Sequence, residues 1–382
     1  MRQPLSRNPT ADRPHGVNSH AAASRPASGH AATLANLDFL RGIAAVAVLL
    51  WHYQHFYYLS AGSPPPPEFR SGQPFFDGLR PLYLNGWMAV EFFWTISGFV
   101  LFHVYGRKPS VDARQYFWAR FSRLYPLHLI TLLLVALLQA VSLTRLGHFQ
   151  IYSHNDLYHF GLQLFFASDW GFQKGFSFNA PIWSVSVEVI SYLVFLVYCR
   201  ASSYRLLPAL AIVLACHVAT RWSAHPAIAC MQFFFAGCSA GIVFHAPDDR
   251  KFRLAFLAPA MLILGAALAY LSDKGPGQLF QLLLFSGLVL GAAQLDRRQF
   301  STGRWGIRVG QITYASYLIH IPVQITALLI LDSLQVSRTI ANQPLFFVGF
   351  LCGTLLLSIL VFRFIEMPLK NWVLMHAGRA RS

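Results

Sequence analysis

Residues 37–59 read LDFLRGIAAVAVLLWHYQHFYYL, and this stretch decides the class of fold. At about 1.5 Å per residue, a helix of this length crosses a hydrocarbon core about 30 Å thick. Arg41 and His52 lie inside the apolar run on nearly the same helix face, about 16 Å apart. Ionisable side chains in a membrane helix are costly and usually mark function. A snorkelling arginine and a structurally paired histidine are the alternative.

The composition extends this conclusion to the whole chain. Of 382 residues, 55% are hydrophobic and only 12% are charged, whereas soluble domains carry about 25% charged residues. We therefore predict an all-α integral membrane protein. Its hydrophobic runs predict about ten transmembrane helices, at residues 37–59, 84–106, 124–146, 181–200, 206–223, 226–246, 252–272, 277–295, 310–332 and 344–366. Residues 157–170 are too short to span and predict an interfacial or re-entrant piece.

The basic residues predict the orientation of these helices. Of the 30 Lys and Arg residues, 21 fall in the two terminal segments and in alternate connections, seven fall on the opposite side, and Arg41 and Arg363 lie within spans. The positive-inside rule then predicts that both termini are cytoplasmic, as an even number of spans requires. The formal charge of +15 is thus a topology signal, and nucleic-acid binding is a poor explanation for it.

The chain divides into three predicted parts. Residues 1–34 are rich in Ala, Ser, Pro, Arg and His without periodicity and predict a disordered cytoplasmic tail. Residues 35–370 form the membrane domain, and residues 371–382 form a short cytoplasmic tail. The five cysteines lack metal-ligand spacing, so no metal is expected.

Several other polar residues lie within the predicted spans. These candidates are Glu91, Ser97, Glu188, His320 and Glu366. Ser184 and Glu188 are four residues apart on one helix face, so they can line one cavity, although a plain interhelical hydrogen bond is the competing interpretation. Glu91 fits a structural ion pair as well as catalysis. His320 comes two residues before Pro322, which is expected to free backbone groups near a cavity.

Arg120 and Arg123 form a second concentration of charge, three residues apart where a helix enters the membrane. Paired guanidinium groups suit phosphate because each donates two parallel bonds. Anchoring to anionic lipids would look similar. No glycine-rich phosphate-binding fingerprint is present, so such side chains would have to hold any phosphate ligand.

Six motifs in this chain resemble the acyltransferase-3 family of bacterial inner-membrane acyltransferases, which includes O-antigen and exopolysaccharide O-acetylases. In chain order, the segments that resemble the family's motifs are Arg41 to His52, Phe92 to Phe99, Arg120 to Pro126, Trp183 to Tyr192, Tyr314 to His320 and Glu366 to Pro368. Val189 departs from the pattern, because many members carry a second glutamate there. Sixteen residues follow Glu366, so no fused SGNH domain is expected.

The resemblance implies an O-acyltransferase of the bacterial inner membrane. It would move an acyl group, expected to be acetyl, from cytoplasmic acyl-CoA to a hydroxyl of an extracytoplasmic or lipid-linked saccharide. Arg120 and Arg123 are expected to hold the phosphates of CoA, with Arg41 and His320 as further donor-binding residues. His52 is the expected general base, because an imidazole removed from water stays neutral.

Three questions stay open at the level of sequence. Glu91, Glu188 or Ser97 can orient the imidazole or polarise the thioester. Direct transfer and an acyl-enzyme are both compatible with the motifs. A transporter or flippase of an anionic or glycan substrate, with Arg41, His52 and His320 as a relay, is the principal alternative, and a scaffolding protein is a third.

Overall fold

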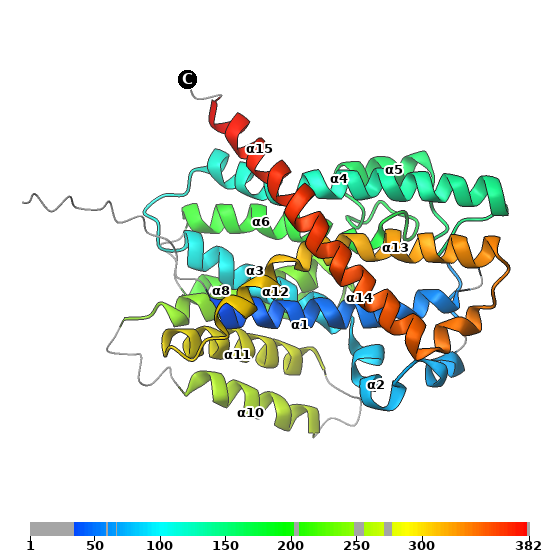
Figure 1. Cartoon of the computed structure of the whole chain (residues 1–382). Coiled ribbons are helices and arrows are strands. Elements are labelled where there is room, and N and C mark those ends of the chain that lie inside the picture. The colour runs from blue at the N-terminus through cyan, green and yellow to red at the C-terminus, as the bar shows by residue number, and fades with distance from the viewer. Residues whose placement is uncertain are drawn as a thin grey trace, which may run out of the picture. The chain divides into compact units, whose positions relative to one another are not determined.

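The computed structural model describes residues 34–58, 60–65, 67–201, 206–247, 256–270 and 277–379. Within these segments the regular elements are helices, and one isolated bridge joins Ser60 and Ser63 (Figure 1). The prediction of an all-α integral membrane protein is confirmed. The tail predicted for residues 1–34 lies outside the described residues except for Leu34.

The longer helices, except α15, follow the predicted spans. They are α1 (Ala35–His52), α3 (Met88–Tyr105), α4 (Ala113–Leu146), α6 (Trp183–Ala201), α7 (Leu206–Ala219), α8 (Pro226–Phe244), α10 (Leu257–Tyr270), α11 (Gln278–Arg297), α13 (Thr313–Ser333), α14 (Pro344–Val361) and α15 (Met367–Arg379). Short helices connect them, namely α2 (Phe76–Asn85), α5 (Leu157–Leu164), α12 (Gly303–Gln311), the 3-10 helices η1 (Tyr53–Tyr57), η2 (Pro67–Gly72), η3 (Ala180–Ile182) and η4 (Arg338–Asn342), and the π-helical turn η5 (Phe362–Glu366).

Eight helical runs in the described part are long and apolar enough to cross a bilayer. They correspond to eight of the ten predicted spans. The other two predictions, residues 206–223 and 252–272, coincide with α7 and α10, which have 14 residues each. An α-helix of 14 residues is about 21 Å long, shorter than the hydrocarbon core. The short segment predicted near residue 157 contains α5, which has eight residues.

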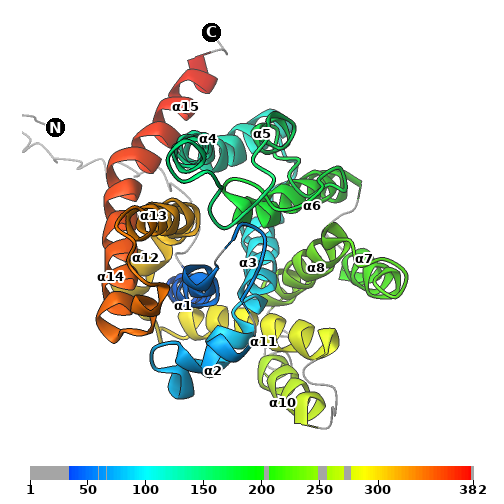
Figure 2. The ribbon, with the colours of Figure 1, turned by 90° about the vertical axis from the view of Figure 1, so that its right-hand side faces the viewer.

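Helix α1 lies at the centre of the described helices (Figure 2). It packs against α2, α3, α11, α12 and α13. Apolar side chains surround it in two clusters. One cluster contains Leu37 and Val48 with the buried faces of α3, α6, α8 and α11. The other contains Leu50, Tyr53 and Phe56 with residues of α4, α13 and α14. Helix α1 and the residues that follow it therefore contribute side chains to both apolar clusters.

Helices α3 and α8 meet backbone to backbone. A Cβ atom added to Gly98 would lie 1.8 Å from the carbonyl oxygen of Phe234, and one added to Gly237 would lie 1.8 Å from that of Thr95. No side chain fits at such a distance, so glycine is required at both positions. Close approach through small residues is the usual way for membrane helices to gain packing contacts. This contact fixes α3, which carries Glu91, Trp94 and Ser97.

Helix α13 contains a proline in its interior. Helix α13 continues through Pro322, which has no N–H group, so the carbonyl of Leu318 loses its helical partner. Asn179 donates a hydrogen bond to that carbonyl, at 2.9 Å. The predicted freeing of a backbone group is thus confirmed.

Residues 371–379 of the predicted tail continue α15, and residues 380–382 lie outside the described part.

Candidate functional site

His52 is the last residue of α1, and its ring orientation is fixed from within the helix. Its Nδ1 atom lies 2.9 Å from the carbonyl oxygen of Val48. Since a carbonyl can only accept, Nδ1 must carry the proton and donate it. The neutral ring then has an unprotonated Nε2 with a free lone pair. That nitrogen can accept a proton, which is the capability a general base requires.

Two further imidazoles flank the His52 ring. The ring centroid of His55 lies 5.1 Å from that of His52, and the centroid of His320 lies 4.8 Å away. His55 and His320 are both buried. The Nδ1 atom of His320 bonds the Ser316 carbonyl at 3.2 Å, and its Nε2 atom has no partner among the described residues. The His52 ring is therefore flanked by two other buried imidazole rings.

The first cavity, which we call the His52 cavity, has a volume of about 180 Å³. His52 and Glu91 supply its imidazole and carboxyl groups. One oxygen of the Glu91 carboxyl group is buried without a described hydrogen-bond partner. Four tryptophans also line this cavity: Trp51, Trp87, Trp94 and Trp183. Large aromatic faces around a few polar groups are typical of a small-molecule binding site.

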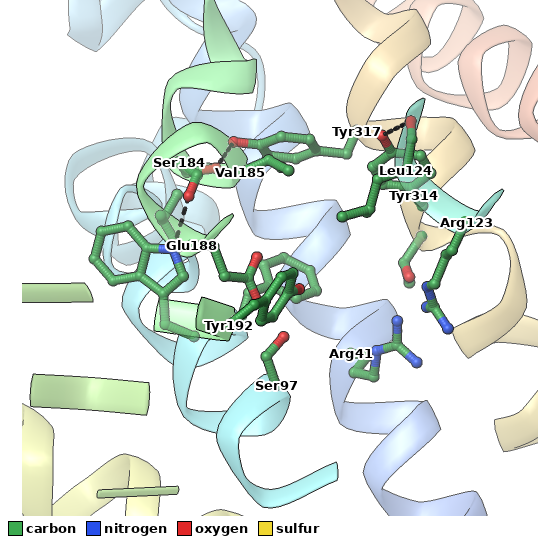
Figure 3. A pocket seen from close by; sticks show the side chains of 14 residues that line it. Arg41, Ser97, Arg123, Leu124, Ser184, Val185, Glu188, Tyr192, Tyr314 and Tyr317 are labelled. Atoms are coloured by element: carbon green, nitrogen blue, oxygen red, sulfur yellow. Dashed lines mark hydrogen bonds between the residues drawn. The ribbon is translucent and has the colours of Figure 1, made fainter. Parts of the chain in front are cut away.

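The second cavity, the Arg123 cavity, is smaller, with a volume of about 90 Å³ (Figure 3). Its polar lining comes from α1, α3, α4, α6 and α13: Arg41, Ser97, Arg123, Ser184, Glu188, Tyr192, Thr313, Tyr314 and Tyr317. The prediction that Ser184 and Glu188 line one cavity is confirmed. The side chains of Ser97 and Tyr192 face the Glu188 carboxyl group in Figure 3.

The two cavities are neighbours that share a wall. Val90, Trp94 and Tyr317 line both of them. The Tyr317 hydroxyl donates to the Pro181 carbonyl at 2.6 Å and lies 2.6 Å from Ser184 Oγ. The Trp94 indole donates to the Ser184 carbonyl at 3.2 Å. These bonds hold the wall at the point where α3, α6 and α13 meet.

Positive charge gathers on the side of the Arg123 cavity away from His52. Arg41 donates to Asp38 at 3.1 Å. Arg120 and Arg123 both lie close enough to Glu188 to attract its carboxyl group electrostatically. Arg123, Lys370 and Arg41 attract the carboxyl group of Glu366 in the same way. Glu366 was predicted to form a cap or salt bridge at the helix end, and it lies in the π-helical turn η5. These basic residues can bind an anionic group at this end of the site.

Six of the eight predicted site residues line one or the other of the two cavities. His52 and Glu91 line one cavity, while four others line the second: Arg41, Ser97, Arg123 and Glu188. His320, expected beside the donor-binding arginines, instead packs on the His52 ring. Arg120 lines neither cavity, and its charge acts on Glu188 and Arg123.

Sequence reasoning did not single out His55, Gln324 or the four-tryptophan lining. His55 follows the end of α1, where the helical periodicity that placed His52 no longer applies. Its spacing of three residues from His52 was the available signal. Within the described ranges, no group of three or more His, Cys, Asp or Glu side chains is arranged to hold a metal ion.

The fold and site define a multi-pass membrane protein with two adjoining polar cavities among its helices. The chain belongs to the acyltransferase-3 family, because the model of that family, described as an acyltransferase domain, matches residues 34–363. The family predicted from the six motifs is confirmed.

A curated relative matches a shorter stretch of the chain. The chain is 32% identical over 103 residues to "Protein 2 in picA locus" of Rhizobium radiobacter. This match covers 26% of the present chain and 42% of the relative, so the chain spans less than half of that protein's length. No solved structure matches the chain.

Proposed function

We propose that this protein transfers an acetyl group from cytoplasmic acetyl-CoA to a hydroxyl of a saccharide presented at the opposite face of the bacterial inner membrane. One observation carries the proposal: the arginine-lined cavity and the His52 cavity share the wall of Val90, Trp94 and Tyr317. An anionic donor and a neutral acceptor can therefore meet at one place from two sides.

Arg41, Arg120 and Arg123 are the proposed donor-binding residues. Guanidinium groups bind phosphate through paired, charge-assisted bonds. The excess of basic residues on the predicted cytoplasmic side agrees with a donor that enters there. The Arg123 cavity has a volume of only about 90 Å³, which favours a short acyl group such as acetyl.

The His52 cavity is the proposed acceptor site. Trp51, Trp87, Trp94 and Trp183 offer apolar faces against which the C–H groups of a sugar ring can pack. His52 and Glu91 supply polar groups that can bond hydroxyls. A polyol with alternating apolar and hydroxyl-bearing faces fits this lining better than an extended hydrocarbon does.

In the proposed reaction, the acceptor oxygen attacks the thioester carbonyl carbon while His52 Nε2 takes the hydroxyl proton. The carbon–sulfur bond breaks, the ester leaves with the acceptor, and the imidazolium returns the proton to the thiolate of CoA. A thioester is already activated, so positioning and one base suffice for direct transfer. Membership in an acyltransferase family favours this reaction over the transporter alternative.

The test uses vesicles that contain the full chain, labelled acetyl-CoA at one face and saccharide acceptors at the other. We expect labelled saccharide from the parent protein and a loss of about 100-fold or more in His52→Ala. Arg120→Ala is expected to require more donor. His376→Ala is the matched control, because His376 is exposed on α15 and lines neither cavity. Full transfer by His52→Ala would exclude the proposed base, and label absent from every saccharide would contradict the proposed acceptor.

A further inference from the structure

The side-chain amide of Gln324 connects the end of α1 to α13 directly beside the proposed base. Gln324 is fully buried. Its Nε2 atom donates to the main-chain carbonyl of His52 at 2.8 Å. Its Oε1 atom lies 2.9 Å from Nδ1 of His55. One side chain from α13 therefore contacts two of the three clustered histidines.

The first of these contacts determines which atom donates and which atom accepts in the second. The carbonyl of His52 can only accept, so the amide must turn its N–H group toward it and its oxygen toward His55. The amide oxygen in turn requires that His55 carry its proton on Nδ1. His55 Nε2 is then an acceptor, 3.5 Å from the Tyr152 hydroxyl. The orientation of the amide thus determines the tautomer of His55.

The bond to the His52 carbonyl lies at the junction between two kinds of helix. Helix α1 ends at His52, and the chain continues as the 3-10 helix η1. The hydrogen bonds of a 3-10 helix have poorer geometry than those of an α-helix, so this junction gains from a further donor. Gln324 supplies that donor to the carbonyl of the residue that carries the proposed base. The flanking rings of His55 and His320 limit rotation of the His52 imidazole.

We propose that Gln324 is a positioning residue that holds the His52 imidazole in its reactive orientation through the His52 carbonyl and the His55 ring. This inference rests on the proposed function of His52. Gln324 lines neither cavity, so in this proposal it acts only through the two histidines. A displacement of about 1 Å in a reacting group can cost about 100-fold in rate.

The experiment compares Gln324→Met with a matched control, Gln139→Met. Methionine keeps the unbranched length of glutamine and loses both hydrogen bonds. Gln139 is also buried and also makes two bonds, donating to the Gln150 carbonyl at 2.9 Å and accepting from the Gln150 N–H at 3.0 Å. Its two hydrogen bonds go to Gln150 and not to His52, His55 or His320, and it lines neither cavity. Both variants lose two buried bonds, but only one of them adjoins His52.

We expect kcat per folded molecule to fall about 10- to 100-fold in Gln324→Met, with the KM for acetyl-CoA unchanged, and to stay at the parent value in Gln139→Met. Diethyl pyrocarbonate, which modifies unprotonated imidazole nitrogens, gives a readout that needs no turnover. His52 should be labelled faster in Gln324→Met than in the parent protein or in Gln139→Met.

Parent-like kcat and parent-like labelling of His52 in Gln324→Met would overturn the inference. An equal fall of kcat in both variants would also overturn it, because loss of stability would then explain the effect. Absence of transfer by the parent protein contradicts the proposed function itself, whereas equal transfer by the parent and Gln324→Met contradicts only the role of Gln324.

Discussion

The hydroxyl group of Tyr317 lies 2.6 Å from Oγ of Ser184, and this contact joins α13 to α6 in the wall between the two cavities. Tyr317→Phe removes the hydroxyl and leaves the buried Pro181 carbonyl without that donor. We expect a loss of stability of about 1–3 kcal/mol and a fall in kcat, because the wall moves.

Tyr53→Phe is the matched control for this prediction. Tyr53 is also buried and donates to a carbonyl, that of Ala341 at 2.7 Å, but it lines neither cavity. Thermal unfolding and kcat are measured on both variants. If kcat falls in proportion to stability in the two proteins alike, Tyr317 has no special part in transfer.

Arg123→Lys separates charge from geometry in the donor site. Lysine keeps the positive charge and loses the planar fork that binds two phosphate oxygens. We expect the KM for acetyl-CoA to rise about tenfold, with a smaller change in kcat. Arg145→Lys, on the exposed far end of α4, should leave both constants at parent values. An unchanged donor KM in Arg123→Lys would argue against phosphate binding at this residue.

The carboxyl groups that line the two cavities should have different kinetic signatures. Glu91 lines the cavity of His52, and Glu188 lines that of Arg123. We therefore expect Glu91→Gln to raise the KM for the saccharide, and Glu188→Gln to raise the KM for acetyl-CoA. Initial rates with each substrate varied in turn measure both constants. The opposite pattern would reverse the assignment of donor and acceptor to the two cavities.

Gly98→Ala and Gly237→Ala should destabilise the protein through the contact between α3 and α8. Each new methyl group would lie 1.8 Å from a carbonyl oxygen, so the helices must separate. Overpacking of this kind costs about 1–3 kcal/mol. Gly349→Ala is the control, because nothing lies within 4 Å of a Cβ atom there. Equal thermal stability of all three variants would show that the helices separate without cost.

The sequence was sufficient to predict the fold class because hydrophobic length is a local property. It was less informative where helices end. Residues 206–223 are apolar over a full span, yet α7 ends at Ala219. The extension of α4 back to Ala113 was likewise not apparent from hydropathy, because Arg120 and Arg123 interrupt the apolar run.

The grouping of the candidate site could be predicted only for residues close in the chain. Ser184 and Glu188 share a helix face, so their common cavity followed from periodicity. His320 and Gln324 also share a face of α13, but their contacts with His52 and His55 join residues about 270 positions apart. Such contacts depend on how distant helices pack together, and the periodicity of a single sequence does not predict that packing.

Glu91, Trp94 and Ser97 stand three residues apart along α3, the helix that the glycine contact fixes against α8. Six residues of α-helix rise about 9 Å, so one rigid element sets the distance between the two proposed substrate positions. On the proposed mechanism, the flexible arm of the donor has to cover that distance. Trp94 and Tyr317, which line both cavities, then lie beside the path that the acetyl group takes in the proposed transfer.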